Sequence, residues 1–160
     1  TKLLYLNAPN NPTGWAIDRA SQKIILEHCR QHGIWILADD AYERLYFDAA
    51  PGAPDVAPSF LDLATPEDRV VSTNTFSKSW LMTGFRLGWV VAPAPLTDTL
   101  ATLIEYNTSC APGFIQRAGV VAIRDGEPVV ARTVARFRAA RDHLVARLAA
   151  LPGIRIARPG

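Results

Sequence analysis

The feature that most constrains the fold is a series of short apolar runs, each closed by polar residues or proline. They are KLLYLN (2–7), IWILAD (34–39), DRVVSTNT (68–75) and LGWVVAP (87–93). Runs this short, rich in β-branched and aromatic residues, predict strands rather than helices. Strands that are apolar throughout are typical of parallel sheets covered on both faces. With helical segments between and after them, they predict an α/β fold with a largely parallel sheet.

The first predicted helix occupies residues 18–33. Asp18 or Ser21 can cap its start, and Gly33 is a typical stop. Its expected apolar face consists of Ile24, Ile25 and Cys29. This helix would connect the first two strands of the sheet.

Two further helical regions follow the last strand. Residues from about 96 to 122 are mostly helical, with a break where Pro112 and Gly113 interrupt the pattern. Residues 127–151 predict one long helix with arginines opposite an apolar stripe. The stripe consists of Val130, Val134, Phe137, Leu144 and Leu148.

Composition excludes several classes of protein. A net charge of +2 without a basic run argues against a nucleic-acid partner, and no apolar run is long enough to span a membrane. Cys29 and Cys110 have no metal-ligand spacing, and no export signal is visible, so we expect a cytoplasmic protein without a metal. The chain opens inside an apolar run and stops at an apparent strand, which predicts part of a longer protein.

Polar clusters follow three of the predicted strands, and ligands in open α/β sheets bind beyond the carboxyl ends of the strands. The first cluster is NAPNNPTGW, residues 7–15. Such residues form loops for backbone reasons alone, which is one interpretation. In the other, Pro12 holds Asn11 rigidly, so that its side-chain amide is offered to a bound oxygen.

The second cluster is LADDAYERLY, in which Asp39 and Asp40 end an apolar strand and Tyr42 follows. Acidic pairs at such places are commonly solvated or cap a helix. A carboxylate at the end of a buried strand, however, needs a partner that offsets its desolvation. A cationic ring nitrogen and an arginine would both serve, and the sequence leaves the two open.

The third cluster is NTFSKSWLMTGFRLGW, residues 74–89, which holds one of three lysines in a chain with fourteen arginines. A lone lysine is ordinarily a surface residue that lays its stem on apolar neighbours. Here Thr75 and Ser77 flank Lys78, and Arg86 follows. A lysine amine can lose its proton and form a Schiff base, whereas an arginine stays charged and matches a phosphate with a fork of donors. The cluster therefore favours an amine nucleophile beside a phosphate site.

These motifs together resemble a known family. Asn-Pro-Thr-Gly, then Asp-x-Ala-Tyr, then Ser/Thr-x-Ser-Lys with Gly-x-Arg-x-Gly is similar to the fold type I aminotransferases that depend on pyridoxal 5′-phosphate (PLP), and within them to the bacterial aspartate-aminotransferase-like group. The resemblance implies a PLP-dependent transferase-like fold. Residues 1–126 would be the second half of the large domain, 127–151 a connecting helix, and 152–160 the start of the small domain.

The resemblance also implies a role for each matching residue. Lys78 would form the Schiff base with PLP and then move a proton between the substrate and the cofactor. Asp39 would pair with the pyridinium nitrogen, and Tyr42 and Asn11 would hydrogen-bond the phenolic oxygen of the ring. The implied phosphate ligands are Thr75, Ser77 and Arg86.

The implied function is transfer of an amino group between an L-amino acid and a 2-oxo acid, by a homodimer in which residues 105–114 are a candidate contact with the neighbouring subunit. Rival functions are a PLP-dependent carbon–sulfur lyase or decarboxylase, and the aminotransferase-like effector domain of a transcription regulator. Thr75 replaces a more usual serine, and Asp40 a frequent glutamate. The family's glycine-rich phosphate loop, its stacking aromatic residue and its carboxylate-binding arginine have no counterpart, so we expect this segment alone not to transaminate.

Overall fold

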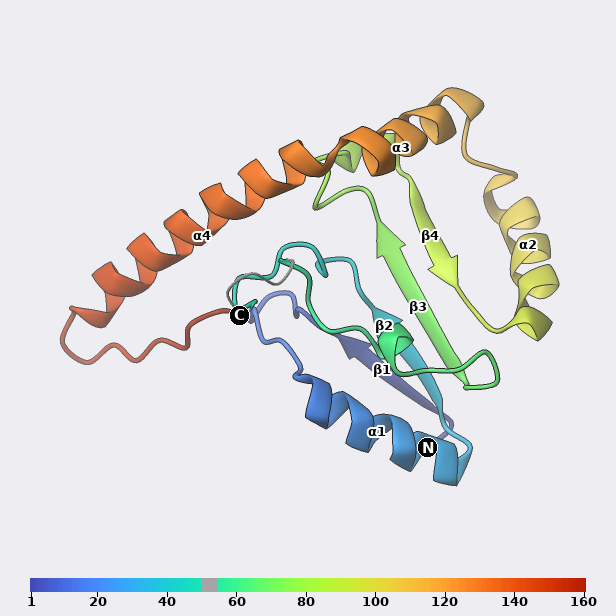
Figure 1. The fold of residues 1–160 in the computed structure, drawn as a ribbon, viewed down its shortest axis with the longest axis horizontal. Helices are drawn as coiled ribbons and strands as arrows, with labels where there is room; N and C mark the ends of the chain where they lie inside the picture. The colour runs from blue at the N-terminus through green and yellow to red at the C-terminus, as the bar shows by residue number, and fades with distance from the viewer. Residues whose placement is uncertain (50–54) are drawn as a thin grey trace.

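The computed structural model describes residues 1–49 and 55–160, and a four-stranded sheet organises that part of the chain (Figure 1). The strands lie in the order β1 (Leu3–Asn7), β2 (Trp35–Asp39), β3 (Val70–Thr75) and β4 (Gly88–Val91). The first three are parallel, and β4 runs antiparallel to β3. All four lie inside the predicted apolar runs, so the prediction of an α/β fold with a largely parallel sheet is confirmed.

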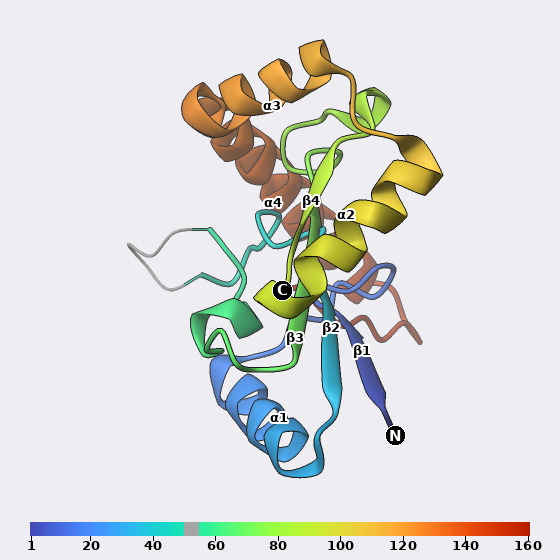
Figure 2. The same ribbon diagram turned by 90° about the vertical axis from the view of Figure 1, so that its right-hand side faces the viewer.

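Helix α1 (Arg19–His32) connects β1 to β2 and lies against one face of the sheet (Figures 1 and 2). Its cap is Asp18, whose carboxylate accepts a 2.8 Å hydrogen bond from the Ser21 amide, and Gly33 ends it with a φ of 63°. Ile24 is 71% exposed, so the prediction that it faces the core is wrong. The buried stripe runs four and then three residues apart, at Gln22, Leu26 and Cys29, and Ile24 points away from it.

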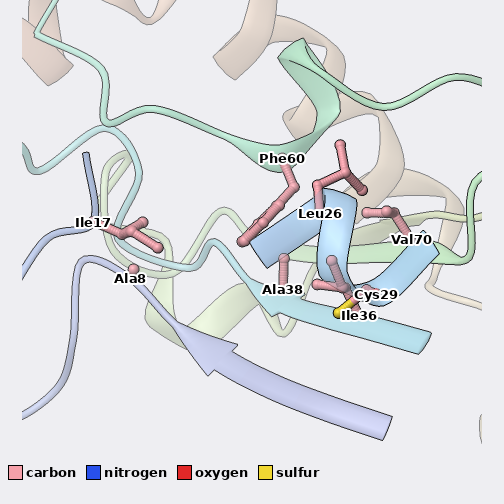
Figure 3. Close-up of a cluster of buried hydrophobic side chains, with 8 residues drawn as sticks. All are labelled: Ala8, Ile17, Leu26, Cys29, Ile36, Ala38, Phe60 and Val70. Carbon is pink, nitrogen blue, oxygen red and sulfur yellow. The ribbon is translucent and has the colours of Figure 1, made fainter. Parts of the chain in front are cut away.

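The hydrophobic core lies between α1 and the sheet. Figure 3 shows Leu26 and Cys29 of α1 facing the side chains of β2 and β3, with Phe60 closing the cluster from the short helix η1 (Phe60–Asp62). Ile36 and Ala38 alternate with half-buried residues along β2, which gives this strand one core face. Packing against α1 therefore decides which side chains of β2 face the core and which, such as that of Asp39, lie on the opposite face.

The remaining helices are α2 (Ala94–Thr108), α3 (Gly113–Asp125) and α4 (Glu127–Ala149), with a short turn η2 (Thr83–Phe85) before β4. The predicted break at Pro112 is confirmed, since Pro112 caps α3. Val130 and Val134 are buried as predicted, but Phe137 and Leu144 are 40% and 55% exposed, so the predicted stripe is wrong in its second half. Arg141 is buried, which contradicts the prediction that the arginines lie opposite the stripe. Its guanidinium pairs with the Asp142 carboxylate at 3.0 Å and donates to the Pro159 carbonyl at 2.9 Å, and these two contacts offset its burial.

No helix in the described residues is both long and apolar enough to cross a membrane. The division into parts of a large domain, a connecting helix and a small domain stays a prediction.

The sheet face opposite α1 is open at several apolar positions. Leu3 and Tyr5 of β1 are 52% and 58% exposed, and Val90 of β4 is 46% exposed. Strand register places all of them on the same face as Asp39, because side chains alternate with a period of two.

Candidate active site

The three predicted polar clusters meet at one edge of the sheet. Asn7 pairs with Asp39 across the β1–β2 ladder, and Asp39 pairs with Thr73 across the β2–β3 ladder. The parallel strands therefore end together, and β3 continues two residues further to Thr75. Each cluster begins where its strand ends, which is where a ligand site in this type of sheet is expected.

Two asparagine side chains shape the first loop. Asn7 Oδ1 accepts a 2.8 Å hydrogen bond from the backbone amide of Asn11, and Asn10 Oδ1 accepts a 2.7 Å hydrogen bond from the Thr13 hydroxyl. The backbone of Asn10 also bonds to Trp15, with its amide 2.7 Å from the Trp15 carbonyl. The loop is thus held by Asn7 and Asn10, which the sequence analysis had not assigned, and it presents an exposed Asn11 side chain.

Asn11, Tyr42 and Lys78 come together at this edge. The Asn11 amide donates to the Tyr42 hydroxyl oxygen at 3.2 Å, and Lys78 Nζ lies 5.6 Å from the centre of the Tyr42 ring. Asn11 and Tyr42 also line a shallow hollow of about 300 Å³, whose walls include Phe47 from the loop after β2 and Phe137 from α4. Residues from three separate loops therefore share one small region.

The loop that carries Lys78 is anchored by aromatic packing. Phe76 lies 5.1 Å, centre to centre, from both Trp80 and Trp89, and the Trp80 indole donates to the Ala122 carbonyl of α3 at 2.9 Å. Lys78 itself is half-buried between these anchors. The aromatic residues around the lysine therefore hold its loop in place.

The predicted phosphate ligands form a chain of contacts rather than a closed ring. The Thr75 hydroxyl donates to Ser77 Oγ at 2.9 Å. The Thr83 hydroxyl donates to the Ser77 carbonyl at 3.0 Å, and Arg86 Nη1 donates to the Thr83 carbonyl at 3.1 Å. Arg86 is exposed and has a φ of 52°, a conformation uncommon outside glycine. Thr83 therefore connects the arginine to the hydroxyl pair.

Asp39 is half-buried, and within the described residues its partner is neither an arginine nor another cation. Its Oδ2 accepts the Tyr5 hydroxyl at 2.7 Å, and its Oδ1 accepts the Ala41 amide at 3.2 Å. None of the three sequence motifs includes Tyr5. Tyr5 lies two residues before Asn7, so it is on the sheet face that also carries Asp39. This proximity can be predicted only when the pairing of β1 with β2 is known.

Asp40 is buried and serves the scaffold. Its Oδ2 accepts the Ser72 hydroxyl at 2.6 Å and the Ser59 hydroxyl at 3.3 Å, which ties the turn after β2 to β3 and to the cap of η1. Burial raises the pKa of this carboxyl, although the two hydroxyls act in the opposite direction. The two neighbouring carboxylates thus differ: Asp39 lies at the carboxyl end of β2 on the sheet face opposite α1, and Asp40 faces the interior.

The raised pKa of Asp40 predicts a pH-dependent stability. Between the unfolded value of about 3.9 and the higher folded value, the folded protein binds more protons, so the free energy of unfolding falls as pH rises through that range. We expect Asp40→Asn to reduce this fall, because the amide accepts the Ser72 bond without carrying a charge. Urea denaturation of both full-length proteins at about pH 4 and pH 7 measures the difference.

The same pH dependence in both proteins would contradict this account of Asp40. A companion variant, Asp40→Leu, should destabilise the protein by about 1–3 kcal/mol, because it leaves the buried Ser72 and Ser59 hydroxyls without their acceptor.

Comparison with known proteins identifies the family of the chain. The family model described as aminotransferase class I and II matches residues 1–159. The chain belongs to this family. Among curated relatives, the arginine–pyruvate transaminase AruH of Pseudomonas aeruginosa is 35% identical over 159 residues, which cover 99% of this chain and 39% of that protein. The aspartate aminotransferase of Pyrococcus horikoshii is 33% identical over 161 residues, with the same two coverages.

Solved structures of two aspartate aminotransferases share the fold. The aspartate aminotransferase of Rhizobium meliloti superposes with a TM-score of 0.85 at 32% identity, covering 99% of this chain and 39% of that one. The aspartate aminotransferase of Thermotoga maritima superposes with a TM-score of 0.86 at 28% identity, covering 99% of this chain and 40% of that one. The PLP-dependent transferase-like fold that the motifs implied is thereby confirmed. The chain spans about 40% of the length of these relatives.

Proposed function

We propose that the full-length protein is a PLP-dependent aminotransferase, which moves an amino group between an L-amino acid and a 2-oxo acid. The observation that carries the proposal is the meeting of the Lys78 amine, the Tyr42 ring and the Asn11 amide at the edge of the sheet where Asp39 ends β2. The relatives described above are named for different amino acids, arginine and aspartate, so the proposal does not extend to a particular amino acid.

The side chains at this edge fit PLP in chemical type. PLP presents a pyridine nitrogen, a phenolic oxygen, an aldehyde and a phosphate. Asp39 supplies a carboxylate for a protonated nitrogen, while the Asn11 amide and the Tyr42 hydroxyl are donors for the phenolic oxygen. Lys78 supplies the amine that the aldehyde requires. The residues suited to the phosphate are Thr75, Ser77 and Arg86.

PLP, when bound, supplies an aldehyde that condenses with amines and a ring that takes up the electron pair left when the substrate α-carbon loses its proton. With PLP in this site, Lys78 would hold the aldehyde through its amine, and its Nζ would serve as the general base for the proton of the substrate α-carbon. Asp39 would stabilise a proton on the ring nitrogen.

The Asn11–Tyr42 bond sets the direction of the tyrosine proton. Because the Asn11 amide donates to the Tyr42 oxygen, the Tyr42 hydroxyl proton stays free for another acceptor. Asn11 has a second amide hydrogen, so the pair offers two donors to one ligand oxygen. Arg86 uses one of its five donors on Thr83 and keeps the others for an anion.

The proposal includes a homodimer located in the cytoplasm. Residues 105–114 remain the proposed contact with a neighbouring subunit, and large exposed side chains in this region support that assignment. Tyr106 of α2 is 88% exposed and Phe114 of α3 is 74% exposed. Aromatic residues are enriched at interfaces between subunits relative to the rest of the surface.

Product analysis of the full-length protein with PLP tests the proposed reaction. A panel of L-amino acids is paired with 2-oxo acids, and both the new amino acid and the new 2-oxo acid are quantified. We expect the two products in equal amounts. Release of a thiol or CO₂ in their place would assign a lyase or a decarboxylase, and a protein that binds PLP without turnover would favour a regulatory domain.

A further inference from the structure

We propose that Tyr5 is a positioning residue for the reaction, whose hydroxyl holds the Asp39 carboxylate in the orientation that receives the ring nitrogen of PLP. The inference rests on the proposed function, because it concerns how this chain prepares Asp39 for that cofactor. It assigns a role to a residue that none of the three sequence motifs contains.

Strand register brings Tyr5 to Asp39. In the parallel β1–β2 ladder Tyr5 pairs with Leu37 and Asn7 with Asp39, so Tyr5 lies one side-chain repeat behind Asp39 on the neighbouring strand. Both side chains are on the same face, since the period of a strand is two. A tyrosine side chain is long enough to reach such a diagonal neighbour, and its hydroxyl lies 2.7 Å from Asp39 Oδ2.

Two donors fix the carboxylate, one on each oxygen. Tyr5 donates to Oδ2 from β1, and the Ala41 amide donates to Oδ1 at 3.2 Å from the turn after β2. Rotation of the carboxyl group would break one or both bonds. Each oxygen also has a second lone pair, so the fixed carboxylate can still accept a bond from a ring nitrogen.

The bond to Tyr5 is the stronger of the two by its geometry. Its donor–acceptor distance of 2.7 Å is shorter than the 3.2 Å of the Ala41 bond, and the charge on the carboxylate strengthens both bonds relative to neutral ones. The same bond is the main cause of a raised pKa for the Tyr5 hydroxyl, so this donor keeps its proton above neutral pH.

The place of Tyr5 on the sheet separates its hydroxyl contact from the packing of the core cluster. Tyr5 is 58% exposed and lies on the face opposite α1 and the core cluster. An exposed ring contributes little to the packing of that core. Its hydroxyl, by contrast, holds one of the two oxygens of Asp39, and a group held in place before binding loses less entropy when a ligand arrives.

The test is a pair of substitutions at Tyr5 in the full-length holoenzyme, with the dissociation constant of PLP as the main readout. Tyr5→Phe keeps the ring and removes the hydroxyl, whereas Tyr5→Leu removes both. We expect both variants to raise the PLP dissociation constant by about three- to tenfold, the effect of one lost hydrogen bond. We expect kcat to fall by a similar factor while the KM for the amino acid stays unchanged.

Matched controls separate this role from a structural one. Tyr46→Phe makes the same chemical change at a half-buried tyrosine in the loop after β2, which takes no part in the bonds of Asp39, and should leave the PLP dissociation constant as it is. The thermal unfolding midpoint of the apo protein should be unchanged in Tyr5→Phe, since the ring remains.

Two results would overturn the inference. Wild-type affinity for PLP in Tyr5→Phe would show that the hydroxyl does not position Asp39, and an effect confined to Tyr5→Leu would assign the role to the ring. If the unmodified full-length protein binds no PLP, the proposed function fails and this inference fails with it. The binding measurement on the unmodified protein therefore distinguishes the two failures.

Discussion

We expect Lys78→Arg to abolish covalent capture of PLP by the full-length protein and to lower its transamination rate on the order of 10³- to 10⁴-fold. Arginine keeps the positive charge and a long stem, so the loop anchored by Phe76 and Trp80 should be unaffected. Its guanidinium does not lose a proton, however, and can neither condense with an aldehyde nor take the α-carbon proton. The measurements are borohydride trapping with peptide mass mapping, and kcat at saturating PLP.

A second lysine provides the matched control. Lys23→Arg makes the same change on the exposed side of α1, which packs on the sheet through other residues, and should leave trapping and turnover unchanged. A reduced pyridoxyl adduct on Lys78 in the unmodified protein, missing from Lys78→Arg, is the expected result. Turnover within tenfold of the unmodified enzyme in Lys78→Arg would refute the assignment of the base.

We expect Asp39→Asn to lower kcat by about 10²- to 10³-fold, the cost of losing one charged group that stabilises a transition state. The asparagine oxygen can still accept the Tyr5 hydroxyl, so the change removes the charge and largely keeps the contact. Without the negative charge, a proton on the ring nitrogen of PLP loses its stabilising partner. Steady-state kinetics at saturating PLP, together with the PLP dissociation constant, measure both consequences.

The adjacent carboxylate makes a stringent control for this prediction. Asp40→Asn is the same substitution one residue away, in the buried pocket formed with Ser59 and Ser72, and should change kcat little. If Asp40→Asn lost as much activity as Asp39→Asn, the two residues would share one role. The assignment of Asp39 to the edge of the sheet and of Asp40 to its interior would then be wrong.

Much of the candidate site could be predicted because its residues follow strands in the sequence. Asn11, Asp39 and Lys78 each lie within four residues of a strand end, and parallel strands that end together bring such residues to one edge. Periodicity also located the helices. It failed at Ile24, Phe137, Leu144 and Arg141, where a stretch rich in apolar or basic residues gave no measure of which side each residue faces.

The partners of these residues could not be predicted, because they depend on register and on contacts distant in sequence. Tyr5 reads as one more strand residue until the ladder places it beside Asp39. Asp40 reads as an exposed acid until Ser59 and Ser72, 19 and 32 residues away, are seen to surround its carboxylate. The roles of the site residues toward PLP stay a proposal, which the substitutions above test.

The antiparallel direction of β4 has a consequence for how this part of the chain tolerates changes in length. Thr75 pairs with Gly88, and the Phe76 amide donates to the Leu87 carbonyl at 3.1 Å, so the segment between them leaves and re-enters the sheet at one point. Both ends of this loop are therefore held by strand pairing, so its ends cannot shift to accommodate a change in length. An insertion or deletion inside it changes the loop's own shape rather than shifting its neighbours, and so changes the reach of Lys78 toward Tyr42 directly. Variation in length within residues 77–86 should therefore be far more damaging than substitution of the exposed side chains along it.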